Sequence, residues 1–390
     1  MKILIVTPKY YPDTFPVNLI AERLVNEGNE VDVLTSTPFK DGKYLNNFHN
    51  KESIENGVKV FRVDAYIRTS SRLSLVRNYL SIGRLFKKWI KRCETQYDCV
   101  YTYSISPITI LSSGNYYKKK YHVPHIVHVL DLWPESVIAT TNMSKHSLFY
   151  RILLRRSRKE YNQASELLYG SPSFIDYLND VIKVKNIKMT YLAQPGLIYE
   201  GEKGENPYDS NKTNLLYCGN ISRLQLLDYI VPAVQKLNNP NVIFNIVGDG
   251  VYLEKIKEEI KDKNIQNIVY HGYYPYQESQ RYFEYADCFY LGLNNSSFVG
   301  KTIPNKLISY LYYAKPIIGM LDGDGKEILE ATGNIVAQQS IDDLVKAIEA
   351  YLCMGSKEIE KIKKKNRQYY DDHFSLDKFI TKLLSSFSGK

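Results

Sequence analysis

The stretch KILIVTPKYYPDTFPVNLIAERLVNEGNEVDVLTSTP (residues 2–38) contains a complete strand–helix–strand pattern. It begins with an apolar run at 2–6, continues with an amphipathic segment at 17–28 that ends at Gly28, and closes with a second β-rich run at 30–36. Buried parallel strands are short apolar runs, whereas the helices between them show a 3.6-residue period. The stretch therefore predicts a βαβ unit and a parallel sheet.

The same alternation continues along the chain in two series. A polar segment with Gly and Pro at 200–211 separates them and has the composition of a linker. The further predicted strands are 58–63, 98–103, 125–130 and 166–171 in the first series, and 214–219, 242–248, 267–272, 288–293, 316–321 and 334–338 in the second.

Two series of this kind predict an α/β fold with two doubly wound, Rossmann-like domains. We expect a first domain at 1–199, the linker at 200–211 and a second domain at 212–370. We expect a C-terminal helix at about 371–390 to pack back on the first domain. Ligands of such sheets bind beyond the carboxyl ends of the strands, which here predicts a central cleft that both domains face.

The composition is that of an ordinary soluble globular protein, with 44% hydrophobic and 24% charged residues among 390. Its five cysteines are scattered and form no CxxC pair, which favours a reducing compartment over disulfides or a thiolate metal site. The apolar run at the start is too short for a signal peptide, and no window approaches the roughly 18 uncharged apolar residues of a membrane span. We therefore expect a cytoplasmic protein.

Several cofactor classes are excluded by missing motifs. No glycine follows the first strand, the segment IVGDGVYLEK has two glycines where a dinucleotide fingerprint needs three, and there is no P-loop pattern. The segment DGDG (322–325) invites a metal interpretation, but Gly333 stands where a calcium loop needs Glu. We interpret DGDG as a glycine-rich loop and expect neither a metal nor a cofactor.

Several motifs occur in an order that is similar to a known enzyme family. After residues 2–38 come NGVKVFRV, VHVLDLWPESV (127–137), LLYCGNISRLQ (215–225), FNIVGDGVYLEKI (244–256) and IPNKLISYLYYAKPIIG (303–319). Over nearly its whole length the chain resembles the family-4 glycosyltransferases of GT-B fold. DLWPES and IPNK are the most specific pieces, and they resemble a bacterial branch that adds N-acetylated sugars, including the N-acetyl-fucosamine type, to lipid-linked surface polysaccharides.

The resemblance implies a retaining, metal-independent transferase. Its donor would be a nucleotide sugar, UDP-linked and carrying an N-acetylated hexose, and its acceptor a polyprenyl-diphosphate-linked glycan in capsule, O-antigen or exopolysaccharide synthesis. Two alternatives stay open. One is a family-4 enzyme with another donor or a soluble acceptor, and the other is a non-catalytic scaffold that binds nucleotide sugars.

A nucleotide-sugar donor needs positive charge and fixed hydrogen-bond donors around its diphosphate. In CGNISRL, Gly219 and Asn220 follow a strand end where the backbone can approach a phosphate, and Arg223 can clamp it in bidentate fashion. Pro304 suits the first turn of a helix, so Lys306 and that helix N-terminus would address the same diphosphate. Ordinary surface charge is the alternative for both basic residues.

Two further glycine-containing segments are donor-site candidates. Gly248 and Gly250 form a turn after the strand at 242–248, which lets the backbone approach a ligand, although a simple turn explains them equally well. Gly272 and Tyr273 lie in HGYYPYQE (271–278), which resembles the loop whose backbone reads the base in the family. Recognition by the main chain would fit uracil.

The family commonly has two carboxylates, eight positions apart, in the segment of IPNK. In this chain Lys301 and Ser309 occupy those places. In the family the second carboxylate binds the ribose hydroxyls and the first contacts the donor sugar. We interpret the change as a branch-specific donor site, because Arg223, Lys306 and Asp131 are all present; an inactive enzyme is the alternative.

The segment HVLDLWPES supplies the acceptor-side candidates. Family relatives carry a catalytic His near the position of Asp131, and a carboxylate there could orient the acceptor hydroxyl or accept its proton. Glu135 would face the same cleft as a second catalytic candidate. His128 lies in a strand-like run and is more often a core residue, Asp131 could instead cap a helix, and Trp133 would either stack on a sugar or pack internally.

Charge is unevenly distributed along the chain. Residues 1–199 carry a formal charge of +11 (28 Lys and Arg against 17 Asp and Glu), and residues 200–390 carry −2 (23 against 25). Residues 65–92 contain eight Lys or Arg and no acid, and 147–159 is similar. Basic helices with Trp, Phe and Leu suit the anionic inner face of the cell membrane, where we expect peripheral binding, unless their apolar faces pack on the protein's own sheet. No nucleic-acid motif accompanies the charge, so we expect no nucleic-acid partner.

Overall fold

The computed structural model describes the chain at residues 1–40, 43–49, 51–69, 71–141, 144–198, 204–295 and 301–388. Its internal contacts divide the chain into two compact units. Unit 1 comprises Met1–Pro195 and Leu376–Lys390, and unit 2 comprises Gly196–Ser375. Of the predicted linker, residues 200–203 lie outside the described part, as do residues 389 and 390 of the predicted C-terminal helix.

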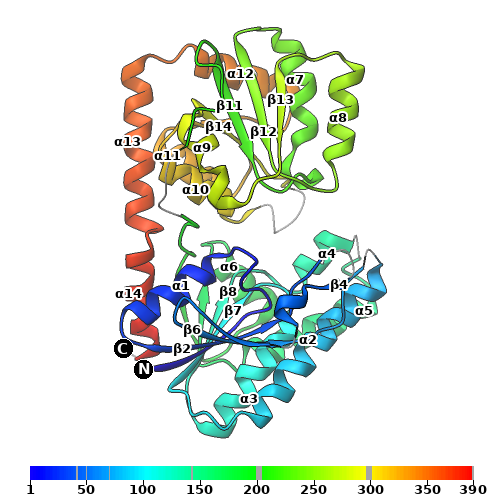
Figure 1. Ribbon diagram of the computed structural model, residues 1–390, viewed down its shortest axis with the longest axis vertical. Coiled ribbons are helices and arrows are strands. Elements are labelled where there is room, and N and C mark those ends of the chain that lie inside the picture. Colours follow the sequence, from blue (N-terminus) through cyan, green and yellow to red (C-terminus); the bar gives the residue numbers. More distant parts are fainter. Residues whose placement is uncertain are drawn as a thin grey trace. The chain divides into compact units, whose positions relative to one another are not determined.

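Unit 1 is built around one large sheet with helices on its faces (Figure 1). Its strands are β1 (Lys2–Val6), β2 (Glu30–Ser36), β5 (Glu52–Glu55), β6 (Val58–Val63), β7 (Cys99–Ser104), β8 (His125–Val129), β9 (Glu166–Tyr169) and β10 (Lys188–Tyr191), with a separate ribbon of β3 (Phe39–Lys40) and β4 (Lys43–Tyr44). The spatial order is β10-β9-β8-β7-β1-β2-β6-β5, and of these neighbours β5 and β6 are antiparallel while the other pairs are parallel.

The helices of unit 1 connect these strands. They are α1 (Pro16–Asn26), α2 (Arg72–Arg92), α3 (Leu111–Tyr121), α4 (Glu135–Thr141), α5 (Leu148–Tyr161), α6 (Phe174–Asp176) and α14 (Leu376–Phe387), with short helical turns η1 (Asn46–Phe48), η2 (Ile108–Ile110) and the π-helical η3 (Tyr177–Ile182). Helix α14 returns from the far end of the chain to pack against α1. Four of its side chains complete the core of unit 1: Phe379, Ile380, Leu383 and Phe387.

Unit 2 is a six-stranded parallel sheet with its own helices (Figure 1). Its strands are β11 (Thr213–Cys218), β12 (Val242–Val247), β13 (Ile268–Gly272), β14 (Cys288–Gly292), β15 (Ile317–Met320) and β16 (Ile335–Val336). Its helices are α7 (Ile230–Leu237), α8 (Leu253–Asp262), α9 (Tyr276–Tyr285), α10 (Asn305–Tyr313), α11 (Asp324–Thr332), α12 (Ile341–Leu352) and α13 (Ser356–His373), with turns η4 (Arg223–Gln225) and η5 (Leu227–Tyr229).

The strand order of unit 2 is β13-β12-β11-β14-β15-β16. The first strand, β11, therefore lies between β12 and β14, and the connections run outward from it in both directions. Strand β1 has the same place in unit 1, between β2 and β7. These are the switch points at which doubly wound sheets bind ligands, beyond the carboxyl ends of the strands. The predicted α/β fold with two doubly wound units is confirmed.

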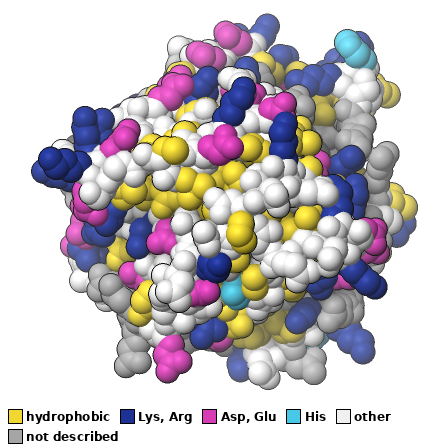
Figure 2. All heavy atoms as spheres, turned by 90° about the horizontal axis from the view of Figure 1, so that it is seen from above, with side chains coloured by type: hydrophobic (Ala, Val, Ile, Leu, Met, Phe, Trp, Pro, Cys, Tyr) yellow, Lys and Arg dark blue, Asp and Glu magenta, His cyan; other side chains and the backbone are white. Residues whose placement is uncertain are grey.

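The basic segment 65–92 forms the long helix α2, and part of its apolar surface is internal. Phe86 and Ile90 are fully buried, and the ring of Trp89 packs 4.7 Å from that of Phe61. Leu80 remains exposed. No helix in the described ranges has the length and apolar character needed to span a bilayer. The charge of segment 65–92 is of one sign, whereas basic and acidic side chains are interspersed on the face of the molecule shown in Figure 2.

Candidate functional site

Two glycines shape the carboxyl end of the unit 2 sheet. Gly219 follows β11 with φ +141°, and Gly248 follows β12 with φ +136°. A Cβ at Gly219 would collide with the side chain of Lys306, and one at Gly248 would collide with the carbonyl of Gly219. The backbones at Gly219 and Gly248 therefore approach each other more closely than a residue with a side chain would permit. Main-chain groups, rather than side chains, thus form the surface at these two strand ends.

The loop after β11 is fixed against the loop after β12. The Ile221 amide donates to the Asp249 carbonyl at 2.8 Å, and a side chain at Gly250 would collide with the carbonyl of Ile221. The Tyr217 hydroxyl donates to the Asn220 carbonyl at 2.5 Å. This loop holds the side chains of Asn220 and Arg223, the latter opening η4, exposed beside the glycine-lined strand ends.

Lys306 occupies the centre of this arrangement. Pro304 is the N-cap of α10, one place earlier than the predicted first turn, so Lys306 is the second residue of the helix. Its Nζ donates to Gln225 Oε1 at 2.7 Å and lies 4.9 Å from the centre of the Tyr217 ring. Its side chain also lies directly beneath Gly219.

The electrostatics of Lys306 are those of an unneutralised cation. Gln225 is neutral, and among the described residues no carboxylate stabilises the ammonium group. Burial therefore lowers the pKa of Lys306 to about 8, partly opposed by the nearby Cys218. An anion bound here would supply the missing counter-charge.

The remaining donor-side candidates surround these residues at different depths. Lys301 has an exposed side chain, and its backbone lies against Gly323, where a Cβ would be too close to it. Ser309 is buried in α10, one turn after Lys306 and on the same side of the helix. Gly272 ends β13 with φ +101° and open space around it, and Tyr273 after it is 68% exposed.

In unit 1, Asp131 follows the carboxyl end of β8. Its Oδ2 accepts hydrogen bonds from the Ser106 amide at 2.9 Å and the Ser106 hydroxyl at 2.8 Å. Burial raises the pKa of Asp131, and the two bonds from Ser106 act in the opposite direction. Trp133, which is almost fully buried, donates from Nε1 to the same Ser106 hydroxyl at 2.9 Å. Asp131, Ser106 and Trp133 thus form one chain of hydrogen bonds.

Glu135 and His128 belong to other networks. Glu135 is 3% exposed; its carboxylate accepts from Tyr150 at 3.0 Å and pairs with Lys145 at 2.8 Å. His128 is fully buried, with Nδ1 2.8 Å from the Tyr101 hydroxyl and Nε2 2.8 Å from the Leu192 carbonyl. Burial lowers the pKa of His128 to about 4, so this imidazole is neutral at pH 7.

Each unit contains one contact residue that the motifs did not single out. Gln225 holds Lys306, and Ser106 holds Asp131 and Trp133. A signal for Ser106 existed, because it comes two residues after β7 and the carboxyl ends of β7 and β8 are adjacent. No group of three or more His, Cys, Asp or Glu within the described ranges is arranged to hold a metal ion.

Part of the chain matches a known protein family. Residues 200–369 match the family model described as glycosyl transferases group 1. WbjE of Pseudomonas aeruginosa, named a probable glycosyltransferase, is 21% identical over 217 residues, 53% of this chain and 54% of that protein. The match thus spans about half the length of this curated relative.

Solved structures cover the whole chain. Sucrose-phosphate synthase from Thermosynechococcus elongatus has a TM-score of 0.76 at 12% identity, over 100% of this chain and 98% of that one. HepE from Anabaena, in complex with UDP and glucose, has a TM-score of 0.68 at 14% identity, and both chains are fully covered. The chain therefore has the GT-B fold, and its residues 200–369 match the model of the glycosyl transferases group 1 family.

Proposed function

We propose that the protein is a retaining, metal-independent glycosyltransferase. It moves a sugar, an N-acetylated hexose, from a UDP-linked donor to a polyprenyl-diphosphate-linked glycan in surface polysaccharide synthesis. The observation that carries the proposal is the half-buried ammonium group of Lys306, which lies beneath Gly219 at the carboxyl end of β11. In the described part of the chain no carboxylate pairs with it. Retention, the sugar and the lipid acceptor come from the family resemblance of the motifs.

The donor half of the proposal follows from charge. When the glycosidic bond breaks, the nucleoside diphosphate leaves with additional negative charge, and groups that bind this charge more strongly in the transition state accelerate the step. Lys306, the N-terminus of α10 and the exposed Arg223 supply positive charge around the strand ends. Gly219 and Gly248 allow the backbone to contact the same phosphates.

On the acceptor side, we propose that Asp131 orients the acceptor hydroxyl and accepts its proton. Ser106 fixes Oδ2 of the carboxylate with two hydrogen bonds. We assign the contact with the acceptor hydroxyl to the other oxygen, Oδ1. Glu135 is already engaged by Tyr150 and Lys145, so we assign it the role of positioning α4 behind Asp131. Trp133 fixes Ser106 in turn.

The test of the donor proposal is a thermal-shift screen against UDP, GDP, ADP and dTDP, because a ligand that binds the folded state raises its apparent stability. We expect UDP to give the largest shift. Addition of EDTA should not change the shift or the transfer rate. A larger shift with another nucleotide would favour a different donor, and a loss of transfer in EDTA would contradict metal independence.

The scaffold alternative rests on Lys301 and Ser309, which stand in place of two carboxylates. It is tested by incubating the purified protein with UDP-sugars and lipid-linked acceptors. Transfer or donor hydrolysis supports the enzyme. Binding of UDP-sugars without turnover, over a panel of acceptors, would favour the scaffold.

We also propose that the protein works at the inner face of the cell membrane. Helix α2 carries Lys88, Lys91 and Arg92 as exposed cations near its C-terminus. Basic side chains of this kind are attracted to anionic lipid headgroups. A lipid-linked acceptor would be available at that surface.

A further inference from the structure

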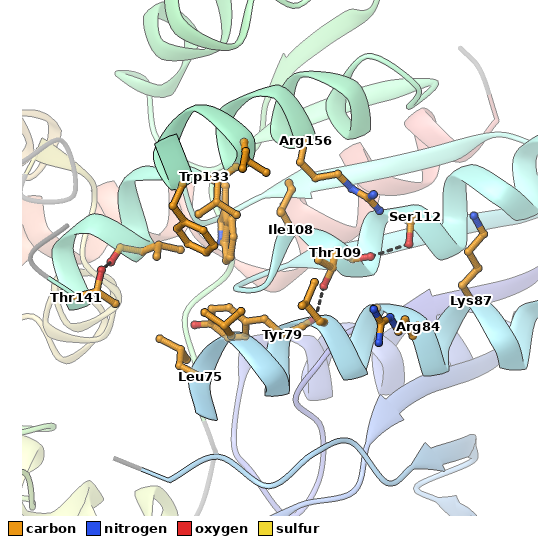
Figure 3. A pocket seen from close by; sticks show the side chains of 17 residues that line it. Leu75, Tyr79, Arg84, Lys87, Ile108, Thr109, Ser112, Trp133, Thr141 and Arg156 are labelled. Atoms are coloured by element: carbon orange, nitrogen blue, oxygen red, sulfur yellow. Dashed lines mark hydrogen bonds between the residues drawn. The ribbon is translucent and has the colours of Figure 1, made fainter. Parts of the chain in front are cut away.

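Unit 1 contains a pocket of about 580 Å³ between α2, α4 and α5 (Figure 3). Its volume is in the range of small-molecule binding sites. Most of its wall is apolar, with Leu75, Val137, Phe149 and Leu153 among the side chains that face it. Trp133 forms part of the same wall.

The serine and threonine hydroxyl groups on the wall are already used. Thr109 donates to the Tyr79 carbonyl at 2.6 Å, Ser112 to the Thr109 carbonyl at 2.8 Å, and Thr141 to the Val137 carbonyl at 2.6 Å (dashed lines in Figure 3). A sugar in this pocket would leave its own hydroxyls without partners, which is costly in a buried site. The interior therefore suits a hydrocarbon chain.

One end of the pocket is basic. The charged side chains among its described lining residues are Arg84, Lys87 and Arg156, and Figure 3 shows them together near Ser112, opposite Leu75 and Thr141. An adjoining pocket of about 500 Å³ shares Lys87 and Arg156 and adds Lys119, Lys120 and Lys159. It is also lined by Glu160, which pairs with Arg156 at 2.7 Å, so we place the phosphate at Arg84 and Lys87. This end therefore suits a phosphate group.

The mouth of the pocket is exposed and apolar. Leu80 of α2 is 45% exposed and Ile152 of α5 is 51% exposed, and both line the pocket. Large aliphatic side chains are thus presented to the surroundings beside a basic rim. This combination matches the boundary between the headgroups and the acyl chains of a membrane.

We propose that this pocket binds one alkyl chain of an anionic membrane lipid, with the lipid phosphate at Arg84 and Lys87. The lipid-linked acceptor does not fit the same arrangement. Trp133, at the end away from the basic group, is joined through Ser106 to Asp131, whereas an acceptor needs its diphosphate and sugar close to Asp131. The inference extends the proposed membrane location and does not depend on transferase activity.

The test uses the fluorescence of Trp133. The chain has two tryptophans, so a Trp89→Phe variant reports on Trp133 alone. Straight-chain alkyl phosphates brominated along the chain are added below their micelle concentrations, and quenching is expected where bromine touches the indole. Affinity should rise about fourfold for each added methylene until the pocket is full. Unquenched Trp133, or affinity independent of chain length, would overturn the proposal.

Matched variants separate the two ends of the lipid. Ile152→Asp, at the mouth, should weaken alkyl phosphate binding at least tenfold, whereas Leu148→Asp, on the same helix but outside the pocket lining, should not. Arg84→Gln should weaken the alkyl phosphate but not the uncharged alkanol of equal length. Arg155→Gln, exposed on α5 but outside the pocket lining, should change neither. Equal effects within either pair would contradict the assigned site.

Two further outcomes keep this inference distinct from the proposed function. Quenching of Trp133 in a protein that transfers no sugar would uphold the lipid pocket and defeat the transferase proposal. Transfer by a protein whose Trp133 is never quenched would do the reverse. Competition between the alkyl phosphate and the lipid-linked acceptor during transfer would show that the pocket belongs to the acceptor, and the assignment to a membrane lipid would fall.

Discussion

Lys306 shows how a single residue links the fold to the proposed donor chemistry. Its lowered pKa means that the folded protein holds the ammonium group less favourably than the unfolded chain, where the usual pKa is about 10.4. The unfolded state therefore binds more protons between pH 8 and pH 10, and the free protein gains stability as the pH rises through this window. A bound diphosphate favours the charged form and reverses this preference.

The first prediction concerns UDP binding. Affinity should fall as the pH rises through about 8, because Lys306 loses its charge there, and Lys306→Ala should weaken binding at pH 7 and remove this pH dependence. Lys301→Ala is the control, since Lys301 precedes the helix and its side chain is exposed. Calorimetric titration of each variant with UDP at pH 7, 8 and 9 measures the affinity and its pH dependence. Equal small losses in the two variants would contradict the role of Lys306.

The second prediction concerns Asp131. Asp131→Asn keeps the shape of the side chain but removes its charge and basicity, so UDP affinity should be unchanged while transfer falls on the order of 10²–10⁴-fold. Glu135→Gln should mainly lower stability, because the substitution removes the buried carboxylate that pairs with Lys145. Transfer rates and thermal unfolding of both variants test this division. Near-normal turnover in Asp131→Asn would make Asp131 structural.

At this scale the motifs predicted which residues are special but not what holds them. Gly219 and Lys306 were both singled out, yet the collision that requires a glycine above this lysine depends on where α10 lies against β11. Gln225 and Ser106 were missed because a neutral amide or hydroxyl gives no charge pattern in a sequence. Only the placement of neighbouring strand ends brings them to their partners.

Among the elements, α2 combines both interpretations of the basic segment. Phe86 and Ile90 pack internally, as the alternative stated, and Lys87 lies 5.6 Å from the ring centre of Tyr116. The apolar spacing of a helix cannot distinguish burial against its own sheet from burial in a membrane. The exposed side chains of α2 are therefore the ones that can address lipid.

The third prediction tests those side chains. Changing Lys88, Lys91 and Arg92 to Gln should weaken binding to anionic liposomes by about 3 kcal/mol, on the basis of about 1 kcal/mol per charge. High salt should weaken the unmodified protein similarly, because the Debye length falls to about 3 Å at 1 M. Co-sedimentation with liposomes measures both effects, and the melting temperature should barely change.

The control removes the same number of charges elsewhere. Lys357, Lys361 and Lys364 are exposed on α13, and their change to Gln should leave liposome binding intact. If both triple variants lose binding equally, net charge rather than α2 is responsible. Unaltered binding in the α2 variant would contradict the role of these cations and favour the apolar mouth of the pocket, at Leu80 and Ile152, as the membrane contact.

The strands show where sequence patterns suffice and where they fail. The central strands β1, β2 and β6 occupy the residues predicted for them, because a strand covered on both faces is a short apolar run. Strands β5 and β10 were missed, since both lie at sheet edges and their side chains are largely polar or partly exposed. These two edge strands lack the apolar run by which the edge strands of unit 2, β13 and β16, were predicted.

For the whole molecule, the path of the chain has an energetic consequence. Unit 2 is continuous, whereas unit 1 is completed by a segment that follows unit 2 in the sequence. Helix α14 contributes four buried apolar side chains to the core of unit 1. At about 1.5–3 kcal/mol for each buried side chain, this contribution is comparable with the whole stability of a typical domain. Unit 1 therefore depends on the last residues of the chain.

The fourth prediction follows from this dependence. Leu383 is fully buried in the core of unit 1, so Leu383→Ala should lower the stability of that unit by about 2–5 kcal/mol, while the exposed Lys382→Ala should have little effect. Because Leu383 lies outside unit 2, UDP affinity should be unchanged at temperatures where unit 1 stays folded. Calorimetric unfolding with and without UDP separates the units, since UDP should raise only the transition of unit 2. A Leu383→Ala protein that loses UDP affinity in parallel with stability would show that the two units fold as one.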